Sequence, residues 1–238
     1  MKLQIESPHM ELARMESARI DVAIRHLLRG AIAPLGDELL PSGIAKTPHT
    51  GPLWLGLEGL AGDEQADRVH HGGPDKALHH YPFEHYAAWR NELTTAQNGG
   101  DGFELGGFGE NISTLGVTEN DVCIGDVFAL GEAKIQISQG RSPCRKLNLR
   151  FGVADMVHRV HATGLTGWYY RVLKAGEVAA GNHLILLERH CPAWPISRVQ
   201  QILFGDRIDR SALMTLAALP QLASNWRTRA ANRLLEDK

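Results

Sequence analysis

The sequence predicts a mostly β protein with some α-helix: a twisted, closed or nearly closed β-barrel with flanking helices, followed by a small three-helix domain. Several short apolar runs lie between Gly- and Pro-rich turns, and few of them have a helical period, which is typical of a barrel. After CPAWP (191–195) three consecutive stretches are helical in pattern. We therefore expect an extension over 1–18, the barrel over 19–190 and the helical domain over 191–238.

The first half of the barrel is expected to contain short strands and one helix. ARIDVAIRHL alternates apolar and polar residues as a half-buried strand does, and the region that follows it, up to residue 52, allows only short strands and turns. KALHHY predicts a short strand. In PFEHYAAWRNEL, Pro82 fits the first turn of a helix whose buried face carries Phe83, Tyr86 and Leu93.

The second half begins with a Gly-dense loop, QNGGDGFELGGFGEN. DVCIGDVFALGEAKIQISQ then predicts two strands joined at Gly131-Glu132, with Ala133, Ile135 and Ile137 facing the same side. VADMVHRVHATG predicts a helix that ends at Gly164. GWYYRVL and NHLILLER predict further strands, and ISRVQQILF, SALMTLAAL and SNWRTRAANRLLE predict the three terminal helices.

Composition excludes several classes of function. The chain has 238 residues, of which 43% are hydrophobic and 22% charged, as in an ordinary soluble globular protein. A net charge of −2 gives no basic surplus for nucleic acid or anionic lipid, and no apolar run approaches the ~20 residues of a membrane span. Residues 1–18 are mixed and charged, unlike a signal peptide, and the three cysteines form no C-x-x-C pair. We expect a cytoplasmic protein that binds neither nucleic acid nor membrane.

Cys144 stands among positive residues in SQGRSPCRKLN, with Arg141 before it and Arg145 and Lys146 after it. The following LNLRF predicts a helix with Pro143 at its first position and Cys144 at its second. Free backbone N–H groups at the helix start, together with the basic side chains, favour the thiolate over the thiol. A thiolate serves as a nucleophile, a redox centre or a soft metal ligand, and a merely packed cysteine is the alternative.

Two histidine pairs flank a glycine-rich turn in RVHHGGPDKALHHYP, at 70–71 and 79–80. Adjacent residues of a strand point to opposite faces, so at most one member of each pair enters a common site. Their spacing matches no standard zinc pattern, and solvated loop histidines are the alternative.

Lys46 and Asn111 lie in Gly- and Pro-punctuated loops, where lysine can pair with a phosphate and asparagine can both donate and accept. Neither G-x-x-x-x-G-K-[ST] nor G-x-G-x-x-G occurs, so nucleotide binding by the standard loops is not indicated.

Taken together, five segments in order resemble the MOSC domain family: SGIAKTP, GLAGDEQADRVHHGGPDKALHHYP, FGENIS, IGDVFALGEAKIQISQ and GRSPCRKL. The three-helix tail resembles that of the YiiM-type branch, which protects against 6-N-hydroxylaminopurine. The resemblance implies a twisted β-barrel that binds a molybdenum pyranopterin, the molybdenum cofactor, with Cys144 as the metal ligand. The family pattern Q-P-R-x-P-C has a proline where this chain has Gly140, and glycine is expected to make the loop before Arg141 more flexible.

The resemblance also implies roles for the other residues named above. Lys46, Arg141 and Ser142 would hold the pterin phosphate, while Asn111, His71 and His80 would line the pocket. His71 and His80 are preferred within their pairs because they belong to the family-like HGG and HYP pieces, and either would supply protons.

The implied reaction is reduction of N-hydroxylated compounds, such as N-hydroxylated purine bases, to amines, with molybdenum shuttling between Mo(IV) and Mo(VI). The chain has no flavin, nicotinamide or iron–sulfur motif, so an NAD(P)H-dependent flavoprotein reductase is expected as electron donor. The tail is open to three roles: docking that reductase, forming a homodimer or covering the barrel end. Two alternatives remain, a sulfur carrier with a persulfide on Cys144 and a non-enzymatic cofactor-binding barrel.

Overall fold

The structure is a computed structural model that describes residues 20–68, 71–93 and 103–236. Its strands are β1 (Asp21–Ala23), β2 (His26–Arg29), β3 (Ala33–Leu35), β4 (Leu40–Ser42), β5 (Thr47–Pro48), β6 (Leu53–Gly56), β7 (Gly59–Leu60), β8 (Leu78–His80), β9 (Ile112–Ser113), β10 (Val127–Leu130), β11 (Ala133–Gly140), β12 (Trp168–Lys174), β13 (Gly176–Val178) and β14 (His183–Glu188). Its helices are η1 (Pro74–Lys76), α2 (His85–Leu93), α3 (Lys146–Phe151), α4 (Met156–Thr163), α5 (Ile196–Phe204), α6 (Arg210–Ala218) and α7 (Ser224–Arg233). The predicted extension over 1–18, His70 and residues 97–102 of the Gly-dense loop lie outside the described residues.

The main sheet curls so that one edge strand comes close to the strand beside the other edge. Its nine strands follow the order β1-β14-β10-β11-β12-β8-β9-β2-β5, so β1 lies at one edge and β2 next to the other. Only Ile24 and Arg25 separate these two strands in the chain, which brings the end of β1 within about 11 Å of the start of β2. Ile24 N donates to Asn182 O beside β14, and Arg25 N donates to Ser113 O in β9. The result is the predicted barrel-like architecture, and the parallel pair of β8 with β9 makes the sheet mixed.

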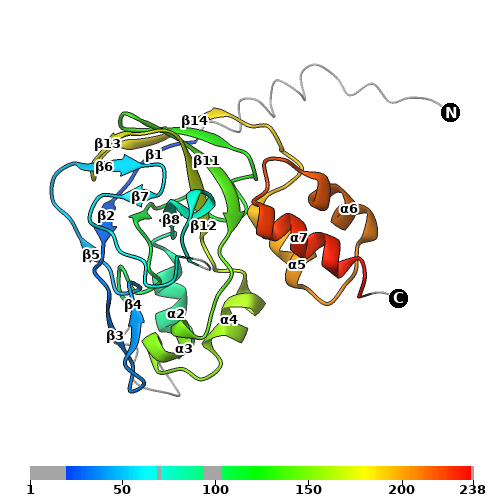
Figure 1. The fold of residues 1–238 in the computed structure, drawn as a ribbon, viewed down its shortest axis with the longest axis horizontal. Helices are drawn as coiled ribbons and strands as arrows, with labels where there is room; N and C mark the ends of the chain where they lie inside the picture. The colour runs from blue at the N-terminus through cyan, green and yellow to red at the C-terminus, as the bar shows by residue number, and fades with distance from the viewer. Residues whose placement is uncertain (1–19, 69–70, 94–102, 237–238) are drawn as a thin grey trace.

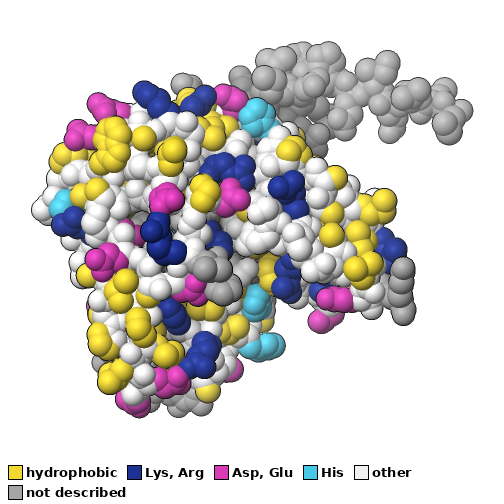
Figure 2. Space-filling view, viewed as in Figure 1, with side chains coloured by type: hydrophobic (Ala, Val, Ile, Leu, Met, Phe, Trp, Pro, Cys, Tyr) yellow, Lys and Arg dark blue, Asp and Glu magenta, His cyan; other side chains and the backbone are white. Residues whose placement is uncertain are grey.

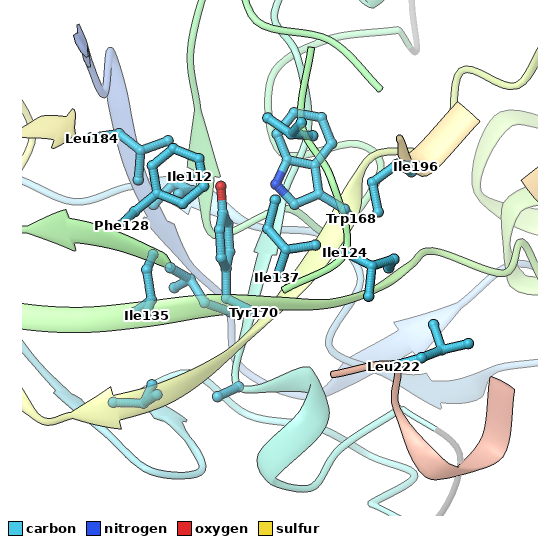
Figure 3. Packing of buried hydrophobic residues seen from close by; sticks show 14 of the residues in the cluster. Ile112, Ile124, Phe128, Ile135, Ile137, Trp168, Tyr170, Leu184, Ile196 and Leu222 are labelled. Carbon is cyan, nitrogen blue, oxygen red and sulfur yellow. The ribbon is translucent and has the colours of Figure 1, made fainter. Parts of the chain in front are cut away.

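The β10–β11 hairpin supplies much of the core inside this sheet (Figure 3). Ala133, Ile135 and Ile137 are buried, while the residues between them are half-exposed, as the alternating pattern predicts. β11 continues beyond the predicted end to Gly140, where it pairs with Trp168 of β12. This extension carries the chain directly to Arg141 and Cys144.

Helices α2, α3 and α4 form a second apolar cluster beside the barrel (Figure 1). Tyr86 and Trp89 of α2 are fully buried there. The predicted helix start at Pro82 is wrong by three residues, because α2 begins at His85 and Pro82 belongs to a preceding turn, where its carbonyl accepts from His85 N. Among the residues described, no helix is both long and apolar enough to cross a membrane.

The three terminal helices form a lobe at the end of the barrel (Figure 1). Their buried residues, including Ile196, Leu213 and Trp226, belong to the same apolar cluster as the barrel core. Backbone hydrogen bonds join the parts; in two of them Ile124 N donates to Trp194 O at 3.0 Å and Ala223 N donates to Ser138 O at 2.9 Å. A division near residue 191 stays a prediction, and the core runs across it without a break.

Candidate functional site

A cavity of about 80 Å³ lies between the end of β4, β8 and the segment that leads from β11 into α3. Five of the predicted site residues line it: Lys46, His71, Asn111, Arg141 and Cys144. Further lining side chains include Glu64, Asp67, Lys76, His79, Lys146 and Tyr169. The predicted site residues Ser142 and His80 do not line it, and Ser142 is exposed.

Cys144 lies in this wall with a half-buried thiol. The predicted helical position of Cys144 is wrong: α3 begins at Lys146 with Arg145 at its N-cap, and the Cys144 carbonyl accepts from Leu147 N at 2.9 Å. Two of the predicted cations, Arg141 and Lys146, line the cavity with the thiol. Arg145 instead forms an exposed ion pair with Glu38. The positive surroundings of Cys144 therefore come from side chains rather than from a helix end.

Lys46 and Asn111 are tied together by a carboxylate that sequence analysis missed, that of Asp63. Lys46 Nζ forms a buried ion pair with Asp63 Oδ2, and Asn111 Nδ2 donates to the same oxygen at 2.9 Å. Gly30 N donates to the other oxygen at 2.9 Å, and Asn111 Oδ1 accepts from His79 N at 3.0 Å. Burial lowers the pKa of Lys46, and the charge and hydrogen bond of Asp63 oppose that shift. The group thus braces the cavity wall by joining β2, β8 and the loop after β7.

The adjacent histidines of β8 have opposite environments. His80 is fully buried, with Nδ1 3.0 Å from Tyr170 Oη and Nε2 2.9 Å from Thr114 Oγ1. Burial lowers the pKa of His80 to about 3. His79 faces the cavity, and its Nε2 is buried without a hydrogen-bond partner. The prediction that His80 lines the pocket is therefore wrong, and His79 takes that place.

The strand pattern contained the signal that distinguishes the two. Leu78 and His80 are two residues apart and share a face of β8, and Leu78 is a core residue. Alternation from the apolar Leu78 would have assigned His80 to the core and His79 to the cavity.

Arg141 is 6% exposed, and its Nη1 is buried without a hydrogen-bond partner. The charge and a hydrogen bond of Arg141 act on Tyr169, whose pKa is nevertheless raised because burial dominates. Gly140 does not loosen this segment as expected. A Cβ there would lie 2.6 Å from Gln200 Nε2 and 2.8 Å from a ring carbon of Trp226, so the close approach of α5 and α7 requires glycine.

His71 lies at the cavity among positive charges. Burial, followed by the charges of Lys146 and Arg141, lowers its pKa to about 4. At neutral pH the imidazole is uncharged. An anion beside Lys146 and Arg141 would offset their effect and raise this pKa.

The donor set fits an anionic group that binds in part through sulfur coordination. Arg141 Nη1 and His79 Nε2 are buried polar atoms with no partner, a costly arrangement that a bound acceptor would relieve. Cys144 supplies a thiol on the same cavity, and Lys146 adds a cation. The volume of about 80 Å³ suits a phosphate or a metal centre with its small ligands. The residues present are compatible with either of these parts of a molybdenum pyranopterin.

Comparison with known proteins gives a consistent result. Residues 67–184 match the MOSC domain, and residues 194–236 match the YiiM-like 3-alpha helix domain. The Escherichia coli protein YiiM is 40% identical over 198 residues, which cover 83% of this chain and 87% of that protein. YflK of Bacillus subtilis is 38% identical over 213 residues, covering 90% of this chain and 94% of YflK.

Crystal structures of YiiM share the fold. The Geobacillus stearothermophilus protein gives a TM-score of 0.74 at 32% identity, covering 90% of this chain and 99% of that one. The E. coli structure gives 0.72 at 35% identity, covering 87% and 94%. A Gibberella moniliformis protein named "Reductase" is 37% identical over 187 residues, which are 78% of this chain and 32% of that protein.

Proposed function

Because the chain belongs to the MOSC family and carries the YiiM-like three-helix domain, we propose that it is a molybdenum-cofactor-dependent oxidoreductase that reduces N-hydroxylated compounds such as N-hydroxylated purine bases. One observation carries the proposal. Cys144, Arg141 and His79 line one small cavity; Cys144 is half-buried, and Arg141 and His79 each have a buried nitrogen with no hydrogen-bond partner. The relative named "Reductase" supports a reductive reaction.

In this proposal Cys144 would hold the molybdenum as a thiolate. Arg141 would donate a hydrogen bond to the anionic part of the cofactor, and Lys146 would add a second positive charge. Lys46 uses one of its three N–H donors to bind Asp63, which restricts where its ammonium group can lie. In the proposal it adds positive charge to the cavity wall. Asn111 has a structural role in the cavity wall, because its side-chain amide hydrogen-bonds to Asp63 and to the backbone N–H of His79.

Reduction of a hydroxylamine to an amine consumes two electrons and two protons and releases water. The cofactor, when bound, would supply the two electrons for this reduction. The protein's part is to bind the substrate beside Cys144, exclude water and deliver protons. His71 is the proposed proton carrier, because an anion beside Lys146 and Arg141 raises its pKa from about 4 toward the working range. His79 would hydrogen-bond the reacting group as a neutral imidazole, since its pKa is lowered mainly by burial and its Nε2 has no hydrogen-bond partner.

Under this proposal the electrons come from a separate NAD(P)H-dependent flavoprotein reductase, and the reaction takes place in the cytoplasm. The α5–α7 lobe is the proposed surface for that reductase or for a homodimer. Its position supports this, because it packs where β11 leads to Arg141 and so lies beside the site.

The proposal is tested by turnover. Protein produced with ample molybdenum cofactor, a reductase and NADH should convert an N-hydroxylated purine to its amine, and Cys144→Ala should reduce the rate at least a hundredfold. Cys191→Ala, which removes a cysteine outside the cavity, is the matched control and should retain the rate. Full turnover by Cys144→Ala, or a persulfide on Cys144 in an inactive wild-type protein, would count against the proposal.

A further inference from the structure

A second, larger cleft lies between α4, the loop that follows it and the helices α5 and α7. Its volume is about 860 Å³, within the range of sites for small organic ligands. Figure 2 shows histidine side chains at the edge of the body where it faces the α5–α7 lobe, with Lys and Arg side chains on the lobe nearby. Arg141 lines both this cleft and the Cys144 cavity, so the two adjoin.

Basic side chains outnumber acidic ones in the walls of this cleft. Arg198, Arg229, His158 and His161 line it together with Arg141. The charges that act on His161 are those of Arg229 and His158, and both, after burial, lower its pKa. Arg229 and His158 therefore lie close enough to His161 for their charges to act on it. Such a set favours an anion, and arginine in particular suits the oxygens of a phosphate.

The two acidic residues among the described walls do not cancel this charge. Glu119 is buried and committed: its Oε1 accepts from Thr166 N at 3.0 Å and Gly167 N at 2.6 Å, and its Oε2 lies 2.8 Å from His85 Nε2. Asp206 is exposed at the rim.

Gln200 adds a buried acceptor to the cleft. Thr166 Oγ1 donates its one hydrogen to Gly167 O at 2.9 Å, so in its contact with Gln200 this oxygen must accept. The Gln200 amide is therefore oriented with Nε2 toward Thr166. Gln200 Oε1 is then buried with no hydrogen-bond partner, in a residue that is 8% exposed. A ligand with an N–H or O–H donor would satisfy this oxygen.

We propose that this cleft binds a phosphate-bearing organic molecule of nucleoside monophosphate size. The phosphate lies against Arg198, Arg229 and the histidines, and a hydroxyl or amino group donates to Gln200 Oε1. The site differs from the Cys144 cavity in its residues, apart from the shared Arg141. It does not depend on the proposed reduction.

The test is calorimetric titration of the full chain with AMP, adenosine and inorganic phosphate at low salt. One AMP should bind per chain, with adenosine and phosphate each at least tenfold weaker, since each offers only part of the recognised groups. Arg198→Gln with Arg229→Gln should weaken AMP binding at least tenfold, because both side chains are exposed and their replacement leaves the core intact. Gln200→Met should weaken it severalfold.

Two control variants separate this site from others. Arg207→Gln removes an exposed charge of the same lobe that does not line the cleft, and should leave AMP binding unchanged. Cys144→Ala alters only the neighbouring cavity and should also leave it unchanged. No AMP binding, binding indifferent to the double variant, phosphate binding as tight as AMP, or equal loss in Cys144→Ala would each overturn the proposal.

Discussion

At the scale of single residues, Asp63 balances a buried positive charge. Its side chain is 1% exposed, that of Lys46 is 6% exposed, and the two form an ion pair below the cavity. Asn111 and the backbone of Gly30 also donate to this carboxylate. Charges so far from water are tolerated only as a complete set.

Replacing Asp63 by alanine should therefore be costly. Lys46 would stay buried without its counter-ion, and we expect a loss of about 3–5 kcal/mol in the free energy of unfolding. Asp37→Ala, at an exposed position, is the control and should change stability by less than about 0.5 kcal/mol. Urea denaturation monitored by circular dichroism measures both, and equal stability of the two variants would refute the structural role of Asp63.

Buried histidines make stability depend on pH. The pKa of His80 is about 3 and that of His71 about 4 in the folded protein, and that of His79 is also lowered, mainly by burial. An unfolded histidine titrates near ~6.5, so below this pH the unfolded chain binds more protons than the folded one. Stability should be complete above about pH 6.5 and should fall as the pH drops toward 3, by about 1.4 kcal/mol per pH unit for each fully buried histidine.

The measurement is the free energy of unfolding at pH 5 and pH 7, with His80→Gln beside the wild type. The variant loses one of the protons taken up on unfolding, so its stability should depend less steeply on pH, whatever its stability at pH 7. An identical slope in both proteins would contradict the assignment of a neutral, buried His80.

The sequence predicted which residues line the cavity better than it predicted which side chains those residues contact. Lys46, Arg141 and Cys144 were recognised from their own neighbours in the sequence, and all three line it. The link from Lys46 to Asn111 depends on Asp63, which lies in another loop and has no local pattern around it. Long-range pairing of this kind is not encoded in spacing.

At the scale of secondary-structure elements, the end of β11 is fitted to the terminal helices. Gly140 pairs with Trp168 in the sheet while Gln200 of α5 and Trp226 of α7 occupy the space where a Cβ would stand. The next residue is Arg141, so the packing of the helices fixes the position of the guanidinium in the cavity wall.

Gly140→Ala should push the helices from the strand. We expect a loss of about 1–3 kcal/mol from overpacking and weaker anion binding at Arg141. Gly56→Ala is the matched control, because a Cβ in that β6 strand meets no atom closer than 3.7 Å. Thermal unfolding measures both, and a Gly140→Ala protein as stable as Gly56→Ala would show that the close approach is not required.

The sequence predicted which helices and strands exist better than it predicted the residues at which they begin and end. The hairpin of β10 and β11 was predicted because its alternation and its turn agree. The start of α3 was not, because Pro143 suits an extended approach as well as a first helical turn, and the chain continues for two more residues before the helix begins.

At the scale of the whole molecule, the barrel and the terminal lobe share one apolar core. Ile196, Leu213 and Trp226 pack in the same cluster as Ile137 and Trp168. Figure 3 shows Ile196 and Leu222 near Ile124, at the lobe end of that cluster. The sequence predicted a separate small domain because the pattern of short strands changes to a helical one near residue 191. That pattern does not show which surface the helices cover.

A shared core predicts cooperative unfolding. Trp226→Ala should cost about 3–5 kcal/mol and lower the stability of the barrel and the helices together. Trp54→Ala, which alters an exposed side chain on β6, should change stability little. Hydrogen exchange at β11 and at α6 reports the two parts separately, and early melting of the helices with an unchanged barrel would contradict the prediction.

The central claim is that the cavity holds a molybdenum cofactor through Cys144. The most direct measurement is molybdenum per chain, by elemental analysis of protein produced with ample cofactor, for the wild type, Cys144→Ala and Cys123→Ala. We predict close to one molybdenum per chain in the wild type and in Cys123→Ala, whose altered residue lies outside the cavity, and loss of the metal in Cys144→Ala. Equal molybdenum in all three proteins, or negligible molybdenum in the wild type, would contradict the account.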